Sequence, residues 1–339
     1  MTVTIRHGDC REVLRTLPAE SVHCCVTSPP YFGLRDYGHA AQIGMEATPD
    51  AFVAEMVDVF REVRRVLRND GTLWLNLGDS YANDGKWGGH TGGKHVKALH
   101  CSPIGRNKRY TGLKAKDLIG IPWLVAFALR ADGWYLRRDI IWHKLNPMPE
   151  SVRDRPSTAH EYLFLLSRAP SYYYDADAIA EIASYGSHGG AAANPGDKAR
   201  QTGNHSGPLG LTPKQRKSVP RGGFGGKTNE LEGREAFRAI VDYRNKRSVW
   251  PLVSKPYPDA HFATFPPGLI EPCILAGCPA GGTVLDPFGG AGTTGMVADR
   301  LRRDAILIEI NPEYAAIADR RLNADAGMFA NISTVKAAK

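Results

Sequence analysis

The stretch Val284-Leu285-Asp286-Pro287-Phe288-Gly289-Gly290-Ala291-Gly292-Thr293-Thr294-Gly295 decides the fold class of this 339-residue chain. A short apolar segment, Thr283–Asp286, precedes the glycines, and a helical pattern, Thr293–Arg302, follows them. Small residues at a strand-to-helix turn let the backbone pass close to a ligand at the carboxyl edge of a sheet. The stretch therefore predicts an open α/β fold with a ligand-binding loop.

Hydrophobic patterning elsewhere alternates between short strands and amphipathic helices. Short apolar runs predict strands at Ser21–Thr27, Thr72–Leu77, Tyr135–His143, Glu161–Leu166, Thr283–Asp286 and Ala305–Ile310. Helical periodicity predicts helices at Ala51–Arg68, Leu118–Ala131, Pro267–Ala276, Thr293–Arg302 and Pro312–Leu322, with Asn69-Asp70-Gly71 ending the first of these. We therefore expect a mostly parallel sheet with helices on both faces.

Several kinds of loop could account for the glycine stretch, and the residues around it distinguish between them. Gly290-x-Gly292-x-x-Gly295 matches the dinucleotide fingerprint, and Glu309 lies near the expected offset. Only one strand and one helix follow the stretch, too few to complete a dinucleotide-binding fold. A phosphate-binding P-loop is excluded because no Lys-Ser/Thr ends the glycines. A purely structural turn leaves the acid unexplained, so we favour a nucleoside cofactor whose ribose hydroxyls donate to Glu309.

Thr27-Ser28-Pro29-Pro30-Tyr31 follows the strand predicted at Ser21–Thr27, so the fold brings it to the same edge as the glycine stretch. Consecutive prolines lack a backbone N–H and have nearly fixed φ, which leaves carbonyl oxygens on a stiff frame. Such carbonyls can accept the protons of a base amino group, while Tyr31 stacks on a base flipped out of a duplex. In isolation the motif would be read as a turn with a buried tyrosine. Its position favours the exocyclic amino group of cytosine or adenine.

The cysteines and histidines point away from two other chemistries. Pro272-Cys273 supplies the dipeptide of a cysteine-nucleophile route to cytosine C5, but it lies upstream of the glycine stretch and inside a predicted helix. No Glu-Asn-Val follows it, so we interpret Cys273 as a packing residue. The six cysteines form no Cys-x-x-Cys pair and the eleven histidines are scattered. We predict buried thiols and no metal site.

The net charge of +8 is concentrated in two glycine-rich segments. Residues 84–116 contain eight Lys or Arg and one acid, and residues 181–250 contain twelve Lys or Arg and six acids. Two such segments suit a polyanion-binding face, although solvated surface loops are an equal alternative on charge alone. No apolar run reaches the ~20 residues that span a bilayer, and no signal peptide is evident.

Together these motifs resemble those of the β class of DNA amino-methyltransferases. The stretch from Asp286 to Thr294 is similar to the family's cofactor motif, and Ser28-Pro29-Pro30-Tyr31 to its catalytic motif. Gly8-Asp9 resembles the pair whose carboxylate contacts the cofactor adenine, and Glu309-Ile310-Asn311 resembles the ribose-binding acid and its neighbours. Residues 260–266, Ala-His-Phe-Ala-Thr-Phe-Pro, resemble the segment that packs against the methionine end of the cofactor.

The resemblance implies S-adenosyl-L-methionine as cofactor and a circularly permuted Rossmann-like methyltransferase fold, because the catalytic motif precedes the cofactor motif. It implies a mostly parallel seven-stranded sheet with helices on both faces and a basic, glycine-rich target-recognition insertion. We expect a catalytic part at residues 1–183 with its basic loop at 84–116. The insertion is then 184–250, the cofactor-binding part 251–325 and a tail 326–339.

The implied site residues fall into three groups. The catalytic group is Ser28, Pro29, Pro30 and Tyr31. The cofactor-binding group is Asp9, Phe265, Pro266, Asp286, Pro287, Phe288, Gly290, Gly292, Thr293, Thr294, Glu309 and Asn311. The DNA-binding group is Lys86, Arg106, Lys108, Arg109, Lys214, Arg216, Lys217 and Arg221.

The target base depends on Ser28. Serine at this position is typical of N4-cytosine enzymes, whereas aspartate is typical of N6-adenine enzymes. A hydroxyl can donate to cytosine N3 while carbonyls receive the amino protons, but adenine N1 and N6 suit the same geometry. We predict cytosine N4, with adenine N6 as the alternative and RNA or a protein amide less favoured. A nicotinamide oxidoreductase would leave Ser28–Tyr31 unexplained, and a catalytically silent DNA-binding protein would need no cofactor.

Double-stranded DNA is the predicted partner, and the family resemblance also leaves open a cognate restriction endonuclease and a homodimer. We expect a cytoplasmic, nucleoid-associated protein encoded by a bacterium or phage, with no membrane association.

Overall fold

The computed structural model describes residues 1–34, 39–82, 112–147, 149–182, 243–253, 265–326 and 331–336. The chain divides into two compact units, of which the first combines Met1–Asp175 with Arg247–Lys339 and the second is Ala176–Lys246. In the second unit, β6 (Glu181–Ile182) pairs antiparallel with β7 (Tyr243–Arg244). The first unit contains the main sheet and both predicted motifs.

The main sheet contains nine strands in the order β11-β1-β10-β9-β2-β3-β5-β4-β8. Only β5 runs antiparallel to its neighbours among these strands, so the predicted mostly parallel sheet is confirmed. In sheet order the strands are Asn331–Lys336, Thr2–His7, Asp304–Glu309, Thr283–Asp286, Val22–Thr27, Leu67–Leu77, His160–Ser167, Tyr135–Lys144 and Val249–Leu252.

The sheet has two more strands than the seven that the resemblance implies, and the strands that the hydrophobic pattern did not predict are β1 and the two edge strands, β8 and β11. β8 contains Pro251, which removes one ladder donor and suits an edge position. It begins within the predicted insertion 184–250 and pairs in parallel with β4. β11 lies within the predicted tail 326–339 and pairs in parallel with β1 over six residues. Neither strand has the continuous apolar run by which a central strand is recognised.

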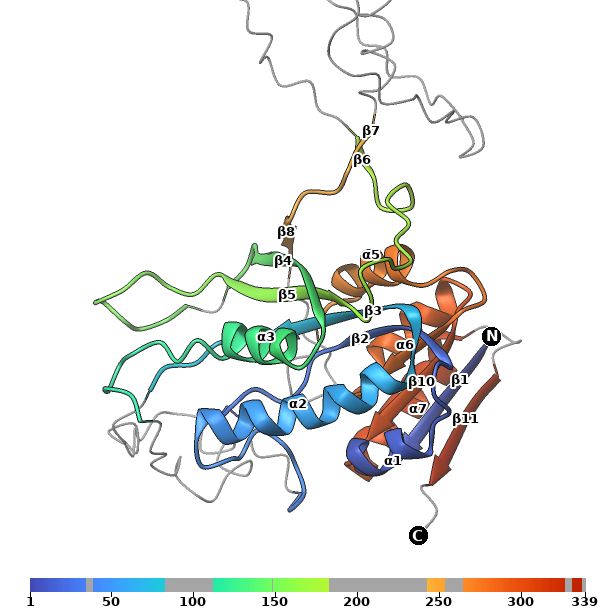
Figure 1. Cartoon of the computed structure of the whole chain (residues 1–339), viewed down its shortest axis with the longest axis horizontal. Helices are drawn as coiled ribbons and strands as arrows, with labels where there is room; N and C mark the ends of the chain where they lie inside the picture. Colours follow the sequence, from blue (N-terminus) through green and yellow to red (C-terminus); the bar gives the residue numbers. More distant parts are fainter. Residues whose placement is uncertain are drawn as a thin grey trace, which may run out of the picture. The chain divides into compact units, whose positions relative to one another are not determined.

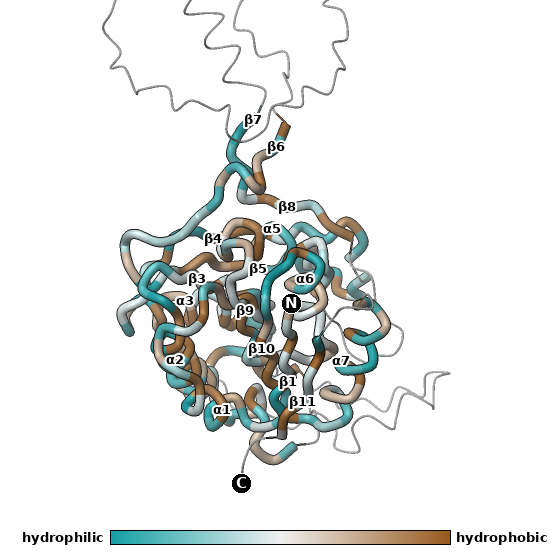
Figure 2. The backbone as a smooth tube through the Cα atoms, turned by 90° about the vertical axis from the view of Figure 1, so that its right-hand side faces the viewer, coloured by the Kyte–Doolittle hydropathy of each residue, from teal (hydrophilic) through white to brown (hydrophobic). Residues whose placement is uncertain are grey.

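Helices cover both faces of the sheet (Figures 1 and 2). On one face α2 packs against both α1 and α3, and on the other α6 packs against both α5 and α7. Their bounds are Cys10–Thr16 for α1, Pro49–Val66 for α2, Ile121–Ala131 for α3, Pro267–Gly277 for α5, Thr293–Arg300 for α6 and Pro312–Asp325 for α7. The sandwich of sheet between helices is the predicted α/β architecture.

Helix α2 shows how local sequence fixes these elements. The Thr48 side chain accepts a hydrogen bond from the Ala51 amide at 3.2 Å, and Pro49 occupies the first turn. Its apolar face is completely buried against the sheet. The helix ends at Val66 and β3 begins directly at Leu67, so the expected stop at Asn69-Asp70-Gly71 is wrong. These three residues instead lie within β3, where the register with β2 shifts between the pair Val22 and Leu67 and the pair Cys24 and Thr72.

The positions of β2 and β9 explain why the two motifs meet. These strands pair in parallel at the centre of the sheet, with Cys24 beside Val284 and Cys25 beside Leu285. After β9 the chain passes into α6 on one face, and after β2 it reaches α2 on the other. Open α/β sheets bind ligands at such a reversal of chain direction, at the carboxyl ends of the strands. Within the described parts of the chain, no helix is both long and apolar enough to cross a bilayer.

Candidate active site

Asp286, the last residue of β9, joins the glycine stretch to the Pro-Pro motif. One of its carboxylate oxygens accepts from the Thr27 hydroxyl at 2.6 Å and from the Phe288 amide at 3.0 Å. The other accepts from the Thr294 hydroxyl at 2.6 Å. The side chain is only 1% exposed, and this burial raises the pKa of Asp286 to about 6. The carboxylate is thus a fixed connection between β2, the loop after β9 and α6.

The glycines of the loop have distinct structural roles. A Cβ on Gly289 would lie 3.0 Å from the Cβ of Leu307, and one on Gly292, where φ is +78°, would lie 3.0 Å from the Cβ of Ala318. Close packing against β10 and α7 therefore requires both to lack a side chain. Gly290 also has a positive φ, +49°, but a Cβ there would have no neighbour closer than 3.9 Å. The backbone at Gly290 is therefore bare on its open side, as close approach by a ligand requires.

Glu309, the last residue of β10, holds the loop from its other side. One carboxylate oxygen accepts from the Gly290 amide at 2.8 Å, and the other accepts from the Asn311 amide at 2.8 Å. Burial raises the pKa of Glu309 to about 7, against the lowering effect of these two amides. The carboxylate is therefore oriented by backbone amides and titrates near neutral pH.

The end of β1 lies beside Glu309 at the same edge. His7 is in register with Glu309, and the Gly8 amide donates to the Glu309 carbonyl at 2.9 Å. The predicted cofactor-binding groups from three neighbouring strands, β1, β10 and β9, are thus brought together. Asp9 follows immediately, and its side chain accepts from the Arg11 amide at 2.9 Å to cap α1.

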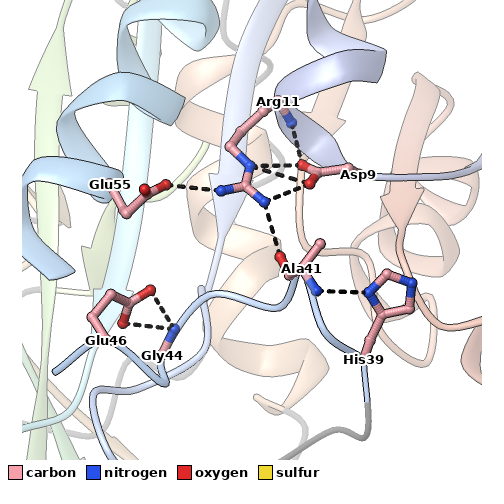
Figure 3. Close-up of polar contacts among 7 residues, drawn as sticks. All are labelled: Asp9, Arg11, His39, Ala41, Gly44, Glu46 and Glu55. Atoms are coloured by element: carbon pink, nitrogen blue, oxygen red, sulfur yellow. Dashed lines mark hydrogen bonds and ion pairs between the residues drawn. The ribbon is translucent and has the colours of Figure 1, made fainter. Parts of the chain in front are cut away.

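Asp9 is engaged by Arg11, which also reaches a distant segment (Figure 3). The guanidinium contacts both Asp9 carboxylate oxygens, the Glu55 carboxylate at 2.9 Å and the Ala41 carbonyl at 2.9 Å. Burial favours a higher pKa for Asp9, but the hydrogen bonds and charge of Arg11 outweigh it and lower the pKa. Asp9 is therefore held as a carboxylate, and Arg11 ties it to α2 and to the segment after the Pro-Pro motif.

The Pro-Pro motif forms a corner after β2, and its hydroxyl groups have partners on two other strands. The Tyr31 hydroxyl lies 2.6 Å from a carboxylate oxygen of Glu161 and 3.2 Å from Oδ1 of Asn76. The Ser28 hydroxyl donates to the same Asn76 oxygen at 3.3 Å. A Cβ on Gly78 would lie 2.5 Å from the Tyr31 ring, so the ring packs directly on the backbone there. The corner is therefore supported by β3 and β5.

Two further side chains complete the polar surroundings of the corner. Lys144, at the end of β4, forms an ion pair with Glu161, and the two side chains are 25% and 14% exposed. The Lys144 ammonium also lies 4.9 Å from the centre of the Trp142 ring. Asn76 is 2% exposed, and its amide group donates to Glu161 at 3.3 Å and to the Tyr162 carbonyl at 3.0 Å. A buried, hydrogen-bonded set of polar groups thus lies behind Ser28 and Tyr31.

Several other predicted cofactor residues have structural contacts. The Asn311 side chain accepts from the Glu313 amide at 2.8 Å and caps α7. The Thr293 hydroxyl accepts from Arg321 at 2.8 Å. Phe265 is half-buried, and Pro266 is buried at the start of α5. Residues 260–264, the remainder of the segment predicted to pack against the methionine end, lie outside the described residues.

All eight predicted DNA-binding residues also lie outside the described residues, in the ranges 83–111 and 183–242. The buried-thiol prediction is confirmed for the five described cysteines, and Cys101 lies outside them. Cys273 lies inside α5 and its thiol donates to the Leu269 carbonyl at 3.1 Å, as expected for a packing residue.

Sequence reasoning missed Asn76, Lys144 and Glu161. A polar residue at the carboxyl end of a predicted parallel strand would have been a usable signal for Asn76 and Lys144. Glu161 gave no such signal, because it lies near the start of β5. It reaches the same edge only because β5 runs antiparallel to β3 and β4. Strand direction is not visible in a short apolar run.

The chain is similar to known DNA methyltransferases over most of its length. The type II methyltransferase M.SmaI of Serratia marcescens is 43% identical over 316 residues, which cover 93% of this chain and 89% of that protein. The PvuII DNA methyltransferase, described as cytosine-N4-specific, has a similar fold, with a TM-score of 0.57, 16% identity, and coverage of 96% of this chain and 92% of that one.

A protein of Thermus thermophilus, TTHA0409, solved in complex with S-adenosyl-L-methionine, superposes with a TM-score of 0.56 at 24% identity, covering 98% of this chain and 99% of that one. The predicted methyltransferase fold is thereby confirmed. The N6/N4 family model, described as DNA methylase, matches residues 22–320. This match also supports the predicted cofactor, S-adenosyl-L-methionine, at the level of the family. By that match and by its identity to M.SmaI, the chain belongs to the N6/N4 DNA methylase family of type II amino-methyltransferases.

Proposed function

We propose that this protein is a site-specific DNA methyltransferase that methylates the N4 amino group of a flipped cytosine in duplex DNA. The observation that carries the proposal is the 2.6 Å hydrogen bond between Thr27 and Asp286. It joins a proline-rich corner that offers hydrogen-bond acceptors to a glycine loop suited to a nucleoside cofactor. The two halves of a methyl-transfer site thus share one sheet edge.

The residues at the ends of β1, β10 and β9 fit the cofactor. S-adenosyl-L-methionine, when bound, supplies an activated methyl group for direct transfer to a nucleophile. Glu309, already oriented by two backbone amides, would accept hydrogen bonds from the ribose hydroxyls, and Asp9 would contact the adenine. The bare backbone at Gly290, the loop residues from Asp286 to Thr294 and Phe265 with Pro266 would surround the remainder.

The corner at Ser28–Tyr31 would receive the target base. The amino nitrogen of cytosine is a poor nucleophile because its lone pair is delocalised into the ring. Acceptors that take its protons in hydrogen bonds help it become pyramidal as the new bond to carbon forms, which stabilises the transition state. The Ser28 hydroxyl and the Pro29 carbonyl would be these acceptors, with Tyr31 stacked on the base. No covalent bond between enzyme and base is required: the N–C bond would form as the S–C bond of the cofactor breaks, which would leave S-adenosyl-L-homocysteine, and one amino proton would pass to solvent.

The choice of cytosine over adenine depends on Ser28, since serine in this motif is typical of N4-cytosine enzymes. N6-adenine methylation is the second candidate, because an adenine amino group presents the same two protons beside a ring nitrogen. A protein amide substrate is less favoured, because two basic segments suit a long polyanion. An RNA substrate is less favoured, because the matching family is described as DNA methylase.

DNA contacts are proposed for the basic segments. Residues 184–250 would form the target-recognition region, and Lys214, Arg216, Lys217 and Arg221 would lie against phosphates or base edges. Lys86, Arg106, Lys108 and Arg109 of the 84–116 segment would contact phosphates. We also propose that the protein has a cognate restriction endonuclease and that it forms a homodimer.

Sequencing DNA from a host that expresses the protein, with detection of N4-methylcytosine and N6-methyladenine, tests this function. We expect N4-methylcytosine at one short sequence context and none in a host that expresses Ser28→Ala. N6-methyladenine at one short sequence context would show that the target base is adenine and not cytosine. DNA that carries neither modification would contradict it.

A further inference from the structure

The hydroxyl groups of Ser28 and Tyr31 are both oriented by side chains that no motif assigns. These are Asn76 at the end of β3 and Glu161 near the start of β5, with Lys144 paired to Glu161. We propose that Asn76 and Glu161 are positioning residues for methyl transfer, which fix the two hydroxyls before the target base arrives. The proposal rests on the proposed function, because it concerns the same corner.

The orientation of the Asn76 amide follows from its partners. The Tyr162 carbonyl can only accept, so the atom 3.0 Å from it must be the NH₂ group of Asn76. The same NH₂ group lies 3.3 Å from the Glu161 carboxylate, which also only accepts when ionised. Oδ1 therefore faces the corner, where it lies 3.3 Å from the Ser28 hydroxyl.

This orientation sets the role of Ser28. Oδ1 of Asn76 has no proton, so the Ser28 hydroxyl donates to it and turns its own lone pairs away from β3. Ser28 then accepts a hydrogen bond from a base amino group and does not donate to a ring nitrogen. The acceptor role is the one that methyl transfer needs, because this hydrogen bond favours the pyramidal nitrogen, whose lone pair is no longer delocalised into the ring.

Glu161 fixes the direction of the Tyr31 hydroxyl, as Asn76 fixes that of the Ser28 hydroxyl. The phenol has one proton, and the 2.6 Å contact to a carboxylate oxygen is shorter than the contact to Asn76, so the proton is donated there. The other Glu161 oxygen is paired with the Lys144 ammonium, which holds the carboxylate in place. With its hydroxyl held at Glu161 and its ring packed on Gly78, Tyr31 has one orientation in which to stack on a base. Holding a reacting geometry in advance lowers the entropic cost of reaching the transition state.

A double-mutant cycle on single-turnover methyl transfer to duplex DNA tests the proposal. We expect Tyr31→Phe and Glu161→Leu each to lower the rate about tenfold, as the loss of one oriented hydrogen bond would. The double variant should be no slower than the slower single variant, because both changes remove one interaction. Glu161→Gln, which keeps an acceptor for the phenol, should recover most of the rate. Cofactor affinity should change less than twofold in every variant, since the hydrogen bond removed joins Tyr31 to β5.

The control is Glu62→Gln on α2. Glu62 is paired with Arg65, its side chain is 27% exposed, and it lies near the end of α2 that leads into the start of β3, opposite the carboxyl edge. It should leave the rate unchanged. A double variant about a hundredfold slower, or Glu161→Leu at the wild-type rate, would overturn the positioning role. A wild-type protein that transfers no methyl group to DNA would instead contradict the proposed function on which this role rests.

Discussion

The proposed site has two halves, a cofactor half at the ends of β1, β10 and β9 and a base half at the Ser28–Tyr31 corner. They are held together by different kinds of contact. In the cofactor half, the Glu309 carboxylate accepts from the backbone amides of Gly290 and Asn311, which lie 19 and 2 residues away in the sequence. In the base half, the contacts join side chains from four strands, with Tyr31 bonded to Glu161 across 130 residues of sequence. The loop of the cofactor half is therefore determined by a local motif, whereas the base half depends on how β2, β3, β4 and β5 pair.

Each half is consequently vulnerable to a different kind of substitution. Only substitution by proline removes a backbone N–H, so the cofactor half depends mainly on the glycines that shape the loop and on the acids that accept from it. The base half depends on polar side chains whose hydrogen bonds must all be made together. A buried network with some of its hydrogen bonds unmade lowers the stability of the fold. Asp286 belongs to both halves because it accepts from Thr27 and from Thr294.

The largest expected effect follows from removing this connection. Asp286→Ala leaves two hydroxyls and one amide buried without their acceptor, so the free energy of unfolding should fall by about 3 kcal/mol. Methyl transfer and cofactor binding should be lost together. Urea denaturation with parallel cofactor titration measures both. A loss of only one activity would show that the two halves are held independently of each other.

The control for this substitution is Asp325→Ala at the end of α7. It removes an exposed ion pair with Arg300, the last residue of α6. Because exposed ion pairs contribute little, the free energy of unfolding should fall by less than about 1 kcal/mol. Methyl transfer and cofactor binding should both be retained.

The next effect should separate the halves. Gly78→Ala places a Cβ within 2.5 Å of the Tyr31 ring, which must move while its hydroxyl is held by Glu161. Single-turnover methyl transfer should slow by about thirtyfold, because small misplacements at a reacting centre are costly. Cofactor affinity, measured by calorimetry, should stay within twofold. Gly268→Ala in α5, where a Cβ meets its nearest neighbour at 3.6 Å, should leave both quantities unchanged. A matching fall in cofactor affinity for Gly78→Ala would argue against separable halves.

A third effect concerns pH and the cofactor half alone. Burial raises the pKa of Glu309 to about 7. In the proposed function the ribose hydroxyls would donate to the ionised carboxylate. The ionised fraction rises from about one tenth at pH 6 to about nine tenths at pH 8, so the dissociation constant of S-adenosyl-L-methionine should fall about tenfold over this range. Titrations at several pH values measure this. Glu309→Gln should bind more weakly and with little pH dependence; an unchanged pH profile in this variant would assign the titration to another group.

The smallest effect concerns Asn311. Its side chain caps α7, so Asn311→Ala should lower the free energy of unfolding by about 1 kcal/mol. Because its side-chain oxygen is occupied by the Glu313 amide, we expect the dissociation constant of the cofactor to change less than twofold. Thermal unfolding and calorimetry on one preparation give both values. A large loss of affinity with unchanged stability would assign Asn311 to the cofactor in place of the cap.

The contrast between the halves also explains which features the sequence could predict. The apolar strand, the glycines from Gly289 to Gly292 and Glu309 lie within one stretch of chain, so their spacing alone predicts a cofactor loop. Ser28–Tyr31 could be predicted as a corner because prolines restrict the backbone locally. Asn76 lies near the carboxyl end of a predicted strand and could have been found in this way, whereas Glu161 could not, because its contribution depends on the direction of β5. The edge strands β8 and β11 were missed for a related reason, since their place depends on pairing and not on apolar content.

Methyl transfer to cytosine is tested most directly by mass spectrometry of nucleosides from duplex DNA incubated with the purified protein and labelled S-adenosyl-L-methionine. The wild-type protein should yield labelled N4-methylcytosine, and Ser28→Ala should yield at least about a hundredfold less while it binds the cofactor with nearly unchanged affinity. Absence of any labelled base with the wild-type protein, or equal labelling by Ser28→Ala, would contradict the proposed chemistry of the Ser28–Tyr31 corner.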